Sequence, residues 1–130
     1  MCKLFYLKRP ISPVWPAILW FITVTVLLCL PGTAFPHEKW YNKIWLDKWI
    51  HIFLFAILTI LFCRAGSAVL GKKLRLLAYI AIGCFIYGVV MEFIQKYFIP
   101  FRSFDVGDII ADGIGSALGL IISIRVYIKK

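Results

Sequence analysis

Four long apolar stretches alternate with shorter polar segments along the chain. The apolar stretches run from about Val14 to Leu30, Lys48 to Cys63, Leu74 to Phe98 and Asp108 to Ile128. A helix needs roughly 20 residues to cross a 30 Å hydrocarbon layer, so this pattern predicts an all-α membrane protein with four transmembrane helices. The second stretch is the shortest, and we expect it to include the polar residues at its start or to continue past Arg64.

The first apolar stretch follows a basic N-terminal segment, as the core of a secretory signal peptide would. It is long for such a core, however, and the bulky pair Phe35-Pro36 stands where small residues would mark a cleavage site. We therefore expect an uncleaved membrane anchor. Pro31-Gly32 after this stretch and Pro100 after the third are predicted to end their helices.

The composition indicates that lipid surrounds the chain. Hydrophobic residues make up 62% of its 130 residues, against about 45–50% in a soluble domain. A chain this short cannot bury so much apolar surface in a core of its own. No repeat, low-complexity tract or flexible linker divides the sequence, so residues 1–130 are interpreted as a single domain.

The basic residues that give the net charge of +9 cluster between the apolar stretches, which is typical of topology signals and not of nucleic-acid binding. Three precede the first stretch, four separate the second from the third, and three follow the fourth. The other five, all six acids and both histidines fall on the opposite side. The positive-inside rule therefore predicts that both termini are cytoplasmic. An outer aromatic belt is predicted from Trp40, Tyr41, Trp45, Trp49 and Tyr97.

This topology brings polar residues from three predicted helices to one membrane level. Asp47 and His51 start the second helix, Glu92 and Gln95 lie near the end of the third, and the segment 102–112 leads into the fourth. Each pair keeps helical spacing, so its side chains share a face. The same face of the fourth helix carries small residues that favour close helix packing, in the series Asp108, Asp112, Gly115 and Gly119.

Charged groups are costly in lipid, by about 2.5–3.5 kcal/mol at the centre of a helix, so these residues are expected to have partners. Arg102 is the only arginine on the outer side. Its planar guanidinium suits carboxylates, and we expect it to pair with Asp105, Asp108 or Glu92.

A plainer interpretation stays open for each acid by itself, since acids at a helix start meet the positive end of the helix dipole. Taken singly, Asp47, Asp105 and Asp108 fit it, and Lys48 fits the related role of an interfacial residue at a helix start. It fits Glu92 and Asp112 less well, because they lie farther along their helices. We interpret the set as a functional site, with a polar network that only locks the helices as the alternative.

Three segments in series resemble the VanZ-like family of small bacterial integral membrane proteins. They are Asp47-Lys-Trp-Ile-His51, Glu92-Phe-Ile-Gln95 and the segment 102–115, and the resemblance spans about residues 47–119. It implies a multi-pass protein of the bacterial cytoplasmic membrane. The family is named for a member linked to resistance to the glycopeptide teicoplanin. Asp112 departs from the family pattern, in which asparagine is usual.

We expect the protein to bind or act on a cell-envelope or lipid-linked ligand at the outer mouth of the bundle, with membrane lipid around it. One alternative is a membrane-embedded acid/base enzyme acting on a lipid-linked substrate, and a second is a small proton-linked transporter. Whether the protein is an enzyme, and whether it forms oligomers, stays open. The candidate catalytic residues are His51, Glu92 and Asp108, and the candidate ligand-binding residues are Asp47, Gln95, Arg102, Asp105 and Asp112.

No cofactor and no metal site are expected. The four cysteines form no CxxC pair, and three of them lie inside apolar stretches. The carboxylates near His51 offer oxygen ligands, but with one histidine and no recognisable ligand motif we predict no bound metal.

Overall fold

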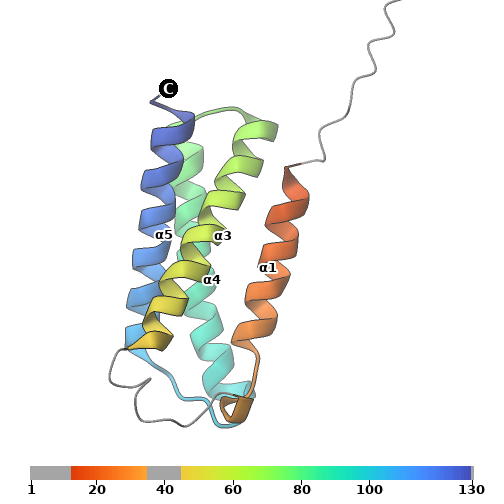
Figure 1. Cartoon of the computed structure of the whole chain (residues 1–130), viewed down its shortest axis with the longest axis vertical. Coiled ribbons are helices and arrows are strands. Elements are labelled where there is room, and N and C mark those ends of the chain that lie inside the picture. Colours follow the sequence, from red (N-terminus) through yellow and green to blue (C-terminus); the bar gives the residue numbers. More distant parts are fainter. Residues whose placement is uncertain (1–12, 35–44, 130) are drawn as a thin grey trace, which may run out of the picture.

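The computed structural model describes residues 13–34 and 45–129, and within these ranges the chain is helical without strands. This confirms the predicted all-α fold with four helices (Figure 1). The elements are α1 (Val14–Leu28), the short 3-10 helix η1 (Gly32–Ala34), α3 (Leu46–Leu70), α4 (Leu74–Phe98) and α5 (Val106–Tyr127).

Three of these helices, α3, α4 and α5, are long and apolar enough to cross a membrane. The second predicted span proves to be 25 residues long, because α3 includes the polar residues at its start and continues past Arg64, as expected. Helix α1 has 15 residues, which corresponds to about 22 Å at 1.5 Å per residue. It is therefore shorter than the first span that the sequence predicted.

The outward faces of the helices are apolar along their length. Large side chains such as Phe53, Ile82, Ile110 and Ile121 are exposed, as expected where lipid and not water covers a surface. Trp45, Trp49 and Tyr97 of the predicted aromatic belt are likewise exposed, whereas Trp40 and Tyr41 lie outside the described residues. The described surface is that of a membrane protein.

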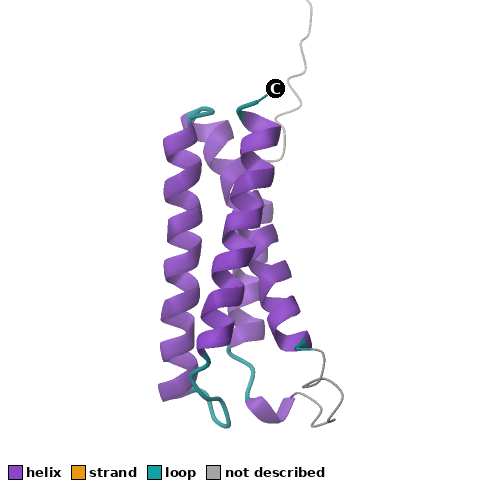
Figure 2. Ribbon diagram, turned by 90° about the vertical axis from the view of Figure 1, so that its left-hand side faces the viewer, coloured by secondary structure: helices purple, strands orange, loops and turns teal. Residues whose placement is uncertain are grey.

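Helices α3, α4 and α5 form the bundle, and α1 lies beside α3 (Figures 1 and 2). The indole Nε1 of Trp20 on α1 donates a hydrogen bond to the carbonyl oxygen of Leu54 on α3 at 3.1 Å. The hydroxyl oxygens of Thr25 on α1 and Tyr87 on α4 lie 2.7 Å apart. The apolar core at this junction consists of Val24, Leu28, Leu54, Phe55, Leu58, Cys84 and Met91.

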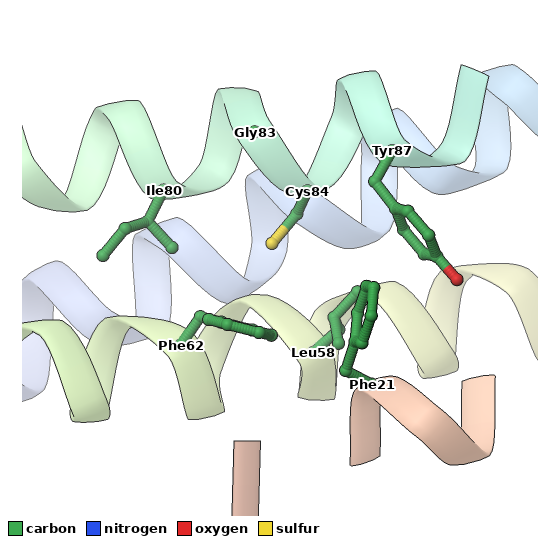
Figure 3. Close-up of a pocket in the computed structure, with 7 residues that line it drawn as sticks. All are labelled: Phe21, Leu58, Phe62, Ile80, Gly83, Cys84 and Tyr87. Carbon is green, nitrogen blue, oxygen red and sulfur yellow. The ribbon is translucent and has the colours of Figure 1, made fainter. Parts of the chain in front are cut away.

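A cavity of about 250 Å³ with an apolar lining lies between α1, α3 and α4 (Figure 3). Its wall is formed by Phe21, Leu58, Phe62, Ile80, Gly83, Cys84 and Tyr87.

Helices α3 and α5 approach closely along a seam of small residues. A Cβ atom added to Gly115 would lie 2.4 Å from the carbonyl oxygen of Ile52, and one added to Gly119 would lie 2.6 Å from that of Ala56. No side chain fits at such distances, so the two glycines set the helix separation. This confirms the predicted seam, and it keeps Asp112 on the protein-facing side of α5.

The beginning of α1 and the end of α5 lie at the same end of the bundle (Figure 1). The beginning of α3, the end of α4 and the beginning of α5 meet at the opposite end. Cytoplasmic placement of the termini stays a prediction, and residues 1–12 and 130 lie outside the described part of the chain.

Candidate functional site

The polar residues singled out in the sequence gather at the end of the bundle where α3 and α5 begin and α4 ends (Figure 1). His51, Glu92, Gln95, Asp108 and Asp112 are all buried. The antiparallel order of the helices explains the gathering, because residues near the start of one helix face those near the end of the next. We call this group, together with Asp47, Lys48, Arg102 and Asp105, the polar end cluster.

Lys48 holds three carboxylates of the polar end cluster. Its Nζ atom lies 2.8 Å from Oδ2 of Asp47 and 2.6 Å from Oδ1 of Asp108. It also donates a hydrogen bond to Asp105. The ammonium group is therefore surrounded by acids from both the start of α3 and the start of α5, which fixes these two helix ends relative to each other.

His51 links α3 to α5 one turn deeper in the bundle. Its Nδ1 atom lies 2.8 Å from Oδ1 of Asp112, within hydrogen-bonding distance. Its Nε2 atom lies 3.8 Å from Oδ2 of Asp108, which is too far for a hydrogen bond. A carboxylate on Nδ1 favours the tautomer that carries its proton there, and this leaves Nε2 able to accept a proton or to coordinate a cation.

Asp105 caps α5 and ties it to α4. Its side chain accepts a hydrogen bond from the backbone N–H of Gly107 at 2.7 Å, and its own backbone N–H donates to Oε2 of Glu92 at 3.0 Å. The hydrogen bond from Lys48 holds the pKa of the Asp105 carboxyl below its ordinary value, and that from Gly107 acts in the same direction. Asp105 is therefore a charged helix cap as well as a partner of Lys48.

Gln95 and Arg102 connect this end of the bundle to the end of α1. The side-chain Nε2 of Gln95 donates to the carbonyl oxygen of Leu28 at 2.8 Å, and Nε of Arg102 donates to that of Leu30 at 3.3 Å. Such bonds satisfy carbonyl groups that a helix end leaves without an internal partner.

The cation that the structure places on Asp105 and Asp108 is Lys48, and not Arg102 as the sequence analysis predicted. Lys48 had been interpreted only as an interfacial residue. The sequence around Lys48 does not indicate its contact with the start of α5, because this contact depends on the separation of α3 and α5.

A cavity of about 540 Å³ opens beside the polar end cluster. His51 and Asp108 line it, and so do Asp47, Arg102 and Asp105. The other members of the polar end cluster are not among its lining residues; they are Lys48, Glu92, Gln95 and Asp112. The remaining wall is apolar except for Ser103, and it consists of Leu27, Leu28, Gly32, Leu46, Ile50, Leu54 and Phe101.

The site can act in three ways by its chemistry. The exposed carboxylate oxygens and Arg102 offer acceptors and donors to a polar ligand. His51, with Asp112 behind it, has the arrangement of an acid/base group held by a carboxylate. Two groups of side chains also have the donor atoms and spacing of a cation site, namely His51 with Glu92 and Asp108, and Asp47 with Asp105 and Asp108.

These features define a small polytopic membrane protein with an ionisable site at one end of its helix bundle. The model of the VanZ/LLP1 family matches residues 11–127, and the chain therefore belongs to this family. The match extends well beyond the segment 47–119 on which the resemblance was based. Neither a curated protein nor a solved structure matches the chain significantly.

Proposed function

We propose that the protein binds the polar head of a lipid-linked ligand of the bacterial cell envelope in the 540 Å³ cavity. The observation that carries this proposal is the division of the cavity wall into a charged part and an apolar part. An amphipathic ligand places its polar group on the first and the beginning of its hydrocarbon chain on the second.

The charged part of the wall suits a head group that has both hydroxyl and anionic oxygens. Asp47 and Asp105 accept hydrogen bonds from hydroxyl or amine groups, and Arg102 donates to an anionic oxygen. The apolar part includes Leu46, Ile50 and Leu54 of α3, of which Ile50 is exposed and Leu54 is buried. A link to teicoplanin sensitivity follows from the family's name and is part of the proposal.

A membrane-embedded acid/base enzyme is the second candidate. It is supported by the hydrogen bond between His51 and Asp112 and by the position of His51 on the cavity wall. In this version His51 Nε2 exchanges a proton with the bound head group, and Asp112 orients the ring. Nothing in the described residues nominates a nucleophile.

A proton-linked transporter is supported less well. Within the described residues, the buried ionisable groups of the acid and histidine types are His51, Glu92, Asp108 and Asp112, and all four lie at one end of the bundle. A proton path through the other half would need further ionisable groups.

The proposal is tested by purifying the protein in mild detergent and analysing its co-purified lipids by mass spectrometry. We expect a lipid-linked envelope species to be enriched with the wild type and reduced with Arg102→Gln. Arg125→Gln is the matched control, because it removes the same charge at the opposite end of α5. Equal lipid content in all three proteins would overturn the proposal.

A further inference from the structure

We propose that His51, Glu92 and Asp108 bind a divalent transition-metal ion between α3, α4 and α5. One donor atom from each residue lies within 4.8 Å of the other two. This inference goes beyond the proposed lipid binding and stands without it. From the sequence we predict no metal site, because it offers one histidine near the carboxylates and no recognisable ligand motif. In the structure the three ligands come from separate helices.

The spacing is close to that of a coordinated ion. Zinc–nitrogen and zinc–oxygen bonds are about 2.0–2.2 Å long, so two ligands of one tetrahedral ion are about 3.3–3.6 Å apart. Nε2 of His51 and Oδ2 of Asp108 lie 3.8 Å apart, and all three donor atoms lie within 4.8 Å of one another. Side-chain shifts of up to about 1 Å bring them to coordination distance. Because each ligand stands on a different helix, one ion would join all three membrane-length helices at this end.

His51 is oriented as a metal ligand. The side chain is only 6% exposed, and Asp112 holds its Nδ1 atom at 2.8 Å. Within the described residues no hydrogen bond reaches Nε2, which instead faces Oδ2 of Asp108 at 3.8 Å. A histidine that donates one ring N–H to a carboxylate and presents the other nitrogen to a cation is the usual arrangement in metal sites.

The charge of the cluster also calls for a cation. Lys48 forms its ion pairs with Asp47, Asp105 and Asp108, and none of these described pairs reaches Glu92, while Asp112 faces His51 at 2.8 Å. Both of these carboxyl groups are 1% exposed. Buried carboxylates need a neutralising partner, which is either a bound cation or a proton.

The second group of possible ligands is already occupied. Asp47, Asp105 and Asp108 also lie close enough together to hold an ion, but the ammonium of Lys48 contacts all three. Oδ1 of Asp108 faces Lys48, whereas Oδ2 faces His51. Asp108 can therefore serve Lys48 and a metal ion at the same time, one with each oxygen.

One imidazole nitrogen and two carboxylates suit Zn²⁺ or Mn²⁺, whereas Ca²⁺ and Mg²⁺ are bound mainly by oxygen atoms. Three protein ligands leave a further coordination position open. His51 and Asp108 both line the 540 Å³ cavity, which would give a ligand access to the ion.

The test is binding of Zn²⁺ to the purified full chain in detergent after treatment with a chelator, measured by titration calorimetry. We expect about one ion per chain and a higher melting temperature with Zn²⁺ than without it. Glu92→Gln removes a ligand and should weaken Zn²⁺ binding by at least about 10- to 100-fold. Losses of this size are usual even for residues that only hydrogen-bond to a ligand. Asp47→Asn removes an acid that belongs only to the other group, and binding should persist.

Three outcomes would overturn the proposal. They are no saturable Zn²⁺ binding by the wild type, undiminished binding by Glu92→Gln, and equal weakening by Asp47→Asn. X-ray absorption of the zinc-loaded wild type needs no variant, and it should show one imidazole among oxygen ligands. Arg102→Gln should bind Zn²⁺ as the wild type does, so failure of the lipid proposal and failure of the metal proposal are separable.

Discussion

His51 on α3 and Asp112 on α5 form a buried hydrogen bond of 2.8 Å between Nδ1 and Oδ1. The neighbouring glycine seam allows this contact. Gly115, about one turn from Asp112, lets α5 pack directly against the backbone of α3. A Cβ atom on Gly88 of α4 would lie 2.6 Å from Oδ2 of Asp112. The absence of a side chain at Gly88 therefore leaves room for the carboxylate among three helices.

The first prediction follows from this hydrogen bond. Asp112→Ala removes the partner of a buried imidazole and should lower the free energy of unfolding by about 1–3 kcal/mol. Asp112→Asn keeps an oxygen acceptor for Nδ1–H and should cost less. Thermal melting in detergent measures both variants, and an equal loss from the two would show that the charge, and not the hydrogen bond, stabilises the fold.

The second prediction concerns the seam between α3 and α5. Gly115→Ala places a methyl group 2.4 Å from the backbone of α3 and should destabilise the bundle by about 1–3 kcal/mol through overpacking. Gly83→Ala is the matched control, since its new methyl group meets nothing within 4 Å. It should be neutral or slightly stabilising. Melting temperatures that fall equally would contradict the close approach of the two helices.

The third prediction concerns pH. Because the pKa of Asp105 is lower in the folded chain than its ordinary value, its charged form stabilises the fold above the ordinary pKa. This contribution is lost as the pH falls through the lowered pKa. Asp105→Asn should therefore flatten the acid limb of the melting temperature plotted against pH. An acid limb identical to that of the wild type would mean that the Lys48–Asp105 contact contributes nothing.

The fourth prediction concerns orientation in the membrane. In a cysteine-free background, Ser103→Cys, beside the polar end cluster, should react with an impermeant thiol reagent applied to intact cells. Lys72→Cys, in the turn between α3 and α4, should be protected, because basic loops stay in the cytoplasm. Labelling at position 72 with protection at position 103 would place the cavity on the cytoplasmic side.

The fifth prediction separates a functional site from a structural lock. Glu92→Gln keeps the shape of the side chain and removes its charge, so a functional site predicts a lost cellular phenotype, such as changed teicoplanin sensitivity, at normal protein level. His51→Ala and Arg102→Lys should behave likewise, since lysine lacks the planar guanidinium. If the phenotype follows protein level in all three variants, the cluster serves only to hold the helices together.

Several features of this protein follow from its sequence alone. The apolar stretches predicted four helices, because a helix must reach a minimum length to cross lipid and must satisfy its own backbone hydrogen bonds there. Both requirements act within one stretch of sequence. The extension of α3 beyond the apolar stretch was predicted from this minimum length, and the seam at Gly115 and Gly119 was predicted from periodicity within one helix. Helical spacing and the alternation of helix direction likewise sufficed to place His51 and Glu92 at one end.

Other features were decided only by the tertiary structure. The pairing of Lys48 with Asp105 and Asp108, in place of Arg102, depends on how far apart α3 and α5 stand, and no local pattern encodes that distance. The choice of Asp112 as the partner of His51 depends on the rotation of both helices about their axes. The cavity depends on how the end of α1, the start of α3 and the segment 101–108 are placed relative to one another. Side-chain identity is local, whereas contact between helices is set by the packing of the whole bundle.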